Sequence, residues 1–125
     1  MSVEASIFLR SLDGLLSYFQ KDRHRRHETE QVALLAMNAA LTATDQYIEL
    51  SKGVKGFDRA AELSLASLWR EAAIRVKVLN QHCVGRFSDK ADYWVSRIEW
   101  DREDIFDKAI DLSSIRKEIA RLIEG

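Results

Sequence analysis

The residues that could do chemistry fall mainly in two short stretches of the chain. Residues 21–27 read KDRHRRH and carry four basic side chains and two histidines. His82 and Cys83 lie together much later, with Arg86 close behind. The cationic residues of the two stretches, Lys21, Arg23, Arg25, Arg26 and Arg86, suit contact with phosphate oxygens. We therefore take these five as candidate residues for binding phosphate or nucleic acid.

A second candidate site pairs Arg75 with His82. The two residues have the spacing R-x6-H, which places them on one side of a helix. This spacing resembles the R-x4–6-H signature of the HEPN-type ribonucleases, which are small helical bundles that often dimerise. The resemblance implies that His82 exchanges a proton with a ribose 2′-hydroxyl while Arg75 stabilises charge on the phosphorane. Val76 stands where that family commonly has a polar residue.

Each of these residues also has a structural interpretation. Glu71 lies four residues before Arg75, which is the favoured orientation for a helix ion pair. A charged histidine in the last turn of a helix interacts favourably with the helix dipole, which suits His82. Cys83 on an apolar seam behaves as a small hydrophobic residue. We favour the structural interpretation, and we expect no metal site because nearby arginines oppose a cation.

The element that must position these residues is a helix expected over residues 57–84. Gly56 and Gly85 flank it, and no helix breaker lies inside. Steps of three and four separate its apolar residues, as in the seam of a core-facing helix. The seam consists of residues Ala61, Leu65, Leu68, Ala72, Val76, Leu79 and Cys83.

Two further long helices are expected before this one. The first runs from residue 2 or 3 to about residue 21, and Phe8, Leu12, Leu15 and Phe19 form its apolar stripe. The second covers residues 28–50 and is apolar nearly all the way round in its middle. Asn38 and Asp45 share one side of that helix, so they should form a structural polar pair or part of a pocket.

The last third of the chain predicts a broken fourth helix from about residue 88, followed by a short C-terminal helix. The sequence DLSS at residues 111–114 should interrupt the chain and cap the last helix. Ile115, Ile119 and Leu122 form the apolar side of that helix.

Together these elements predict an all-α fold. We expect an antiparallel up-down four-helix bundle with a broken fourth helix and a short C-terminal helix, forming one domain over residues 1–125. In such a bundle the first and third turns lie at the same end. The basic stretch should therefore meet His82, Cys83 and Arg86 there.

Composition narrows the class of protein. The 125 residues include no proline and five glycines, which favours long helices. A net charge of −1 shows no overall basic excess, so nucleic-acid binding would need a local patch. One cysteine fits a reducing cytoplasm. We see neither a secretory signal nor a stretch apolar enough to cross a membrane.

The function we infer from the sequence is a helical interaction or regulatory module with no catalysis and no cofactor of its own. It would act through self-association, as a homodimer, or through docking to a partner protein. Apolar residues beyond a single seam on the second and third helices favour this hypothesis, and we expect a prokaryotic, cytoplasmic protein. The alternatives are a HEPN-like metal-independent ribonuclease using Arg75 and His82, and phosphate or RNA binding by the basic corner at residues 21–27.

Overall fold

The computed structural model describes residues 3–21, 28–52, 58–79 and 109–124. Within the first and the last of these ranges, side chains are described only for residues 9–21 and 111–124. These residues form four α-helices joined in the order α1 (Val3–Lys21), α2 (Glu28–Ser51), α3 (Arg59–Lys77) and α6 (Ala109–Glu124). The described part of the chain contains no strand. The predicted all-α fold is therefore confirmed, and the first two helices begin and end where the sequence predicts.

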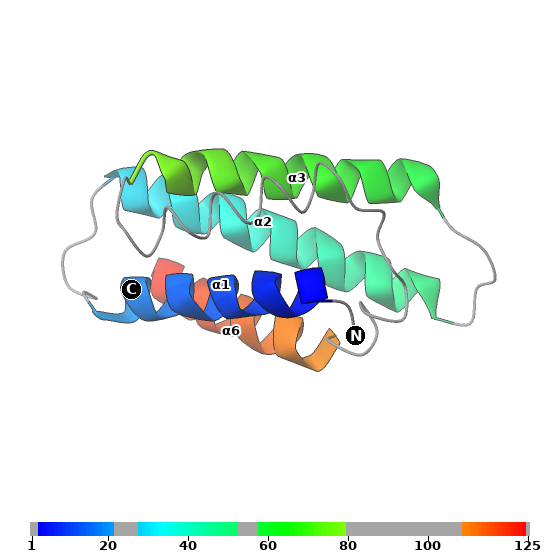
Figure 1. The fold of residues 1–125 in the computed structure, drawn as a ribbon, viewed down its shortest axis with the longest axis horizontal. Helices are drawn as coiled ribbons and strands as arrows, with labels where there is room; N and C mark the ends of the chain where they lie inside the picture. The colour runs from blue at the N-terminus through cyan, green and yellow to red at the C-terminus, as the bar shows by residue number, and fades with distance from the viewer. Residues whose placement is uncertain (1–2, 22–27, 53–57, 80–108, 125) are drawn as a thin grey trace.

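The helices lie side by side along the length of the molecule (Figure 1). In Figure 1, α1, α3 and α6 run in one direction and α2 runs in the other. Helix α2 is the central element, because it packs against both α3 and α6, while α1 packs against α6. The end of α1, the start of α2 and the end of α3 lie at one end of the molecule.

The core is built from the apolar stripes that face inward. Leu12, Leu15 and Phe19 of α1 are fully enclosed, in agreement with the spacing of the first helix. Helix α2 contributes Leu34, Met37 and Leu41, together with alanines that let the neighbouring helices approach closely. Gly14 faces open space, with nothing within 4 Å of an added Cβ, so it is a tolerated glycine rather than a close helix contact.

Helix α3 ends earlier than the sequence predicts. The predicted helix continued to residue 84 with Gly85 as its end, but α3 stops at Lys77. The backbone N–H of Leu79 donates to the carbonyl of Val76 at 3.0 Å, which closes a tight four-residue turn of the 3₁₀ type. Two β-branched residues, Val76 and Val78, weaken helix propensity at this point.

The buried side of α3 agrees with only part of the predicted seam. Leu65, Ala72 and Val76 are buried as expected, whereas Ala61, Leu68 and Leu79 are only partly buried and Cys83 lies outside the described residues. The side that faces the core also includes residues the seam left out, namely Glu62, Trp69 and Ala73.

The predicted interruption at residues 111–114 is wrong, because α6 runs through it without a break. Leu112 is buried at one helical turn from Ile115, so it extends the stripe that Ile119 and Leu122 continue. Asp111 lies in the first turn, where an acidic side chain is stabilised by the helix dipole. The predicted helix from about residue 88 lies outside the described residues up to residue 108.

Candidate functional site

Two of the predicted site residues belong to the described part of the chain, Arg75 and Lys21. The others lie outside the described residues, namely Arg23, Arg25, Arg26, His82 and Arg86. The basic corner and the Arg75–His82 pair therefore both remain predictions.

Arg75 lies on the exposed side of α3 and is held by Glu71. Its Nε donates to Oε1 of Glu71 at 2.8 Å, and both side chains are about half exposed, at 49% and 50%. This is the helix ion pair that the spacing predicts. The ribonuclease hypothesis can be tested by the double substitution Arg75→Ala and His82→Ala, which would abolish RNA cleavage if the pair is catalytic.

Lys21 is exposed in the last turn of α1. It ends α1 at the end of the molecule where α2 begins and α3 ends (Figure 1). The end of α6 lies there as well, which the sequence did not predict.

A buried polar contact joins α2 to α3 through Thr44. Trp69 Nε1 donates to Thr44 Oγ1 at 3.1 Å, and the same hydroxyl donates to the carbonyl of Ala40 at 2.7 Å. Trp69 and Thr44 are both fully enclosed. Because a buried donor without an acceptor is costly, this contact fixes how α3 lies on α2.

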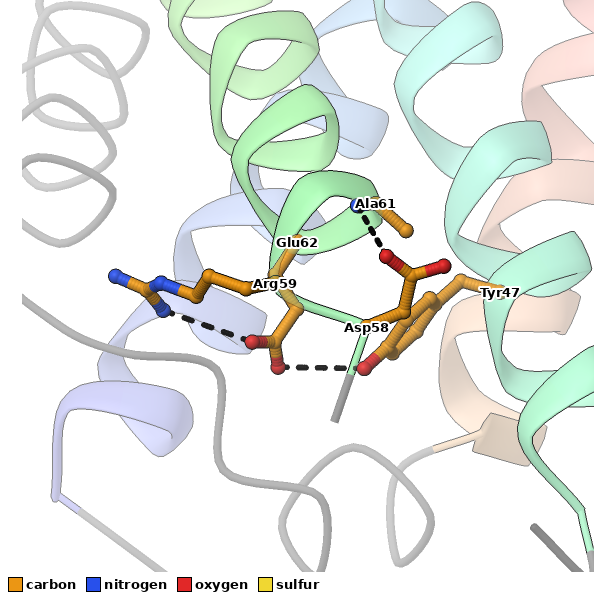
Figure 2. A network of polar contacts seen from close by, with 5 residues as sticks. All are labelled: Tyr47, Asp58, Arg59, Ala61 and Glu62. Carbon is orange, nitrogen blue, oxygen red and sulfur yellow. Dashed lines mark hydrogen bonds and ion pairs between the residues drawn. The ribbon is translucent and has the colours of Figure 1, made fainter. Parts of the chain in front are cut away.

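A second buried polar contact surrounds Glu62 at the start of α3 (Figure 2). Asp58 caps the helix by accepting from the backbone N–H of Ala61 at 3.0 Å. One helical turn later, Glu62 is only 3% exposed. Its Oε2 accepts from the hydroxyl of Tyr47 at 3.2 Å, and its Oε1 lies 3.5 Å from Nη1 of Arg59.

Both carboxylate oxygens of Glu62 are therefore engaged. A buried charge is tolerated when it is paired and hydrogen-bonded, which Tyr47 and Arg59 provide. This arrangement joins α2 to α3. The sequence shows no sign of it beyond an acid on the apolar side of α3, because Tyr47 is fifteen residues away.

A hollow of about 600 Å³ lies between the C-terminal half of α2 and the first half of α6. Nine of the ten residues that line it are polar or charged, namely Thr42, Asp45, Gln46, Glu49, Lys52, Ser113, Ser114, Arg116 and Lys117, and the tenth is Ile48. Arg116 Nε donates to Asp45 Oδ2 across it, and Lys52 pairs with Glu49 at 3.0 Å. The carboxylates of Asp45 and Glu49 are therefore both paired with cations, and Lys117 lies in the same wall.

The predicted polar pair of Asn38 and Asp45 does not form as one unit. Asp45 bonds to Arg116, whereas Oδ1 of Asn38 is buried without a hydrogen-bond partner among the described residues. The sequence missed this contact because Asp45 and Arg116 are 71 residues apart and meet only through the packing of α6 on α2.

Metal binding and membrane insertion find no support in the described residues. They contain no group of three or more His, Cys, Asp or Glu side chains that could hold a metal ion. None of the described helices combines the length and the apolar character that a membrane span requires.

The outer sides of α2 and α3 carry the most unusual feature of the described surface. Six large apolar side chains are exposed there: Val32, Leu35 and Leu50 on α2, Leu63 and Ile74 on α3, and Val78 directly after the end of α3. Single exposed apolar residues are ordinary, but residues that recur along one side of a helix indicate a contact surface.

A comparison of the chain with protein-family models, curated proteins and solved structures finds no match.

Proposed function

We propose that this protein is a helical interaction module without catalysis of its own, which self-associates through the outer side of α2. The observation that carries the proposal is the line formed by Val32, Leu35 and Leu50, which are exposed by 36%, 50% and 79%. Val32 and Leu50 are eighteen residues apart, or five helical turns, so they superpose along α2. Leu35 lies one turn from Val32, beside the same line.

Burial of this line supplies the driving force for association. Fully burying a large apolar side chain contributes about 1.5–3 kcal/mol, and a two-fold dimer buries each residue twice. The cost of association is of similar size, about 4–15 kcal/mol. We therefore expect a dimer of moderate affinity that dissociates on dilution. We expect it in the cytoplasm, where the single cysteine stays reduced.

The residues along the line favour an antiparallel pair of α2 helices. Small side chains, including the exposed Ala39, occupy the centre of the line, and larger ones occupy its ends. An antiparallel contact would place Val32 against Leu50 of the second copy. A parallel contact would instead set Glu28 in the first turn of α2 close to Glu28 of the second copy, which opposes like charges.

Multi-angle light scattering over a range of concentrations tests self-association. We expect the wild type to approach a dimer mass and the variant Leu35→Ser/Leu50→Ser to stay a monomer. The matched control is Leu63→Ser/Ile74→Ser, which removes two exposed apolar side chains from α3 instead and should still dimerise. A monomer mass for the wild type at high concentration, or equal effects of the two variants, would overturn the proposal.

Disulfide cross-linking tests the orientation in a Cys83→Ser background. Mixing Val32→Cys with Leu50→Cys chains should give a cross-linked heterodimer upon oxidation. In an antiparallel dimer the two copies of residue 32 lie about 27 Å apart, since eighteen residues separate them from the contact with residue 50. A Val32→Cys homodimer linked through that residue would instead establish a parallel contact.

A further inference from the structure

The outer side of α3 differs from that of α2 in its charge. Leu63, Ser67, Arg70, Ile74 and Lys77 follow one another at steps of four, three, four and three residues, which is the spacing of a helix contact. We call these five residues, with Val78 beside them, the α3 stripe. Leu63, Ile74 and Val78 are exposed by 58%, 46% and 59%.

The cations of the α3 stripe have no acidic partner in the described part of the chain. The other two arginines of α3 are paired, Arg59 with Glu62 and Arg75 with Glu71. Arg70 and Lys77 are exposed, and no such pair involves them. They are seven residues apart, so they lie in line two helical turns from each other, about 10 Å along the axis.

The positive charges of Arg70 and Lys77 indicate which kind of molecule can bind to the α3 stripe. A second copy packed stripe against stripe would bring the cations of both copies together, which is unfavourable. A nucleic acid would use the two cations but leave three large apolar side chains without a contact. A helix with its own apolar residues flanked by carboxylates would satisfy both features of the stripe.

We propose that the α3 stripe docks an acidic amphipathic helix of a partner protein. The apolar side of that helix packs on Leu63, Ile74 and Val78. Its carboxylates, two turns apart, pair with Arg70 and Lys77. This site is separate from the self-association surface on α2, so the same chain can dimerise and hold a partner.

Fluorescence anisotropy with two synthetic probes tests the site. The first is a labelled 21-residue helical peptide with leucines at heptad spacing and glutamates beside them, and the second replaces every glutamate with lysine. We expect the glutamate peptide to bind at least about tenfold more tightly at low salt, and 0.5 M salt to weaken it, since exposed charges are screened.

Matched variants assign the binding to the α3 stripe. Arg70→Glu/Lys77→Glu and Leu63→Ser/Ile74→Ser should each weaken the glutamate peptide by about tenfold or more. Lys52→Glu/Lys117→Glu makes the same change in charge at the α2–α6 hollow and should bind as the wild type does. Leu35→Ser/Leu50→Ser should also bind the peptide, as a monomer.

Three results would overturn the inference. The first is equal binding of the two peptides or no binding of either, and the second is retained binding after the charge reversal of Arg70 and Lys77. The third is that phosphatidylserine vesicles or a mixed-sequence RNA bind in place of the peptide and are released by that reversal. A monomeric wild type that still binds the glutamate peptide would refute self-association alone.

Discussion

At the scale of single residues, Thr44 connects two helices through one oxygen atom. The substitution Thr44→Val keeps the shape of the side chain but removes the hydroxyl that accepts from Trp69 Nε1 in a fully enclosed position. We expect the free energy of unfolding to fall by about 1–3 kcal/mol. Urea denaturation followed by circular dichroism measures this change.

Thr42→Val is the control for that substitution. Thr42 lies on the same helix, lines the hollow and is only partly buried. We expect a change of no more than about 0.5 kcal/mol there, as at most surface positions. Equal losses at Thr42 and Thr44 would show that the Trp69 contact contributes nothing.

The buried hydrogen bond between Tyr47 and Glu62 can be tested in the same way. Tyr47→Phe and Glu62→Met each leave a buried polar group with one partner fewer, whereas the double variant removes both groups. A double-mutant cycle should therefore show a coupling of about 0.5–3 kcal/mol, with the double variant less destabilised than the sum of the single ones. Strictly additive losses would mean that the two side chains do not interact.

These residue contacts differ in how far the sequence predicts them. The ion pair of Glu71 and Arg75 is local and follows from a spacing of four residues, so it could be predicted. The contact between Thr44 and Trp69 spans twenty-five residues and depends on how α3 packs on α2. Spacing along one helix carries no information about such a contact.

At the scale of elements, a substitution at Gly14 tests whether the helix propensity of α1 contributes to the stability of the protein. An alanine Cβ at this position would meet nothing within 4 Å, so it should cause no clash. We expect Gly14→Ala to raise the free energy of unfolding by about 1 kcal/mol. Thermal or urea unfolding of the variant measures the gain.

Gly14→Val serves as the comparison for this prediction. Its β-branched side chain loses rotamer freedom in a helix, so the gain should be smaller than for alanine. A loss of stability for both variants would mean that Gly14 is needed for a close contact or a bend.

The ends of the helices show which elements could be predicted from the sequence. Apolar spacing located α1 and α2 well, because their stripes stop where the helices stop. The capping residues at 111–114 predict a break that does not form, because Leu112 is buried on the same stripe as Ile115 and the helix continues through it. At the end of α3, a tight turn closed by a backbone hydrogen bond ends the helix before the glycine.

At the scale of the whole molecule, the all-α fold followed from long amphipathic segments and the absence of proline. The two candidate contact surfaces, on the outer sides of α2 and α3, could be predicted from the sequence only in outline. The sequence indicated that the second and third helices carry more apolar residues than one seam needs. Only the exposed fractions of the side chains show that Leu35, Leu50, Leu63 and Ile74 face outward while the others face the core. Such a distinction needs the packing of all the helices together.

The most direct test of the account is the mass of the protein in solution. Light scattering should show a concentration-dependent dimer for the wild type and for Leu63→Ser/Ile74→Ser, and a monomer for Leu35→Ser/Leu50→Ser. A wild type that stays monomeric at the highest concentration would contradict self-association through α2.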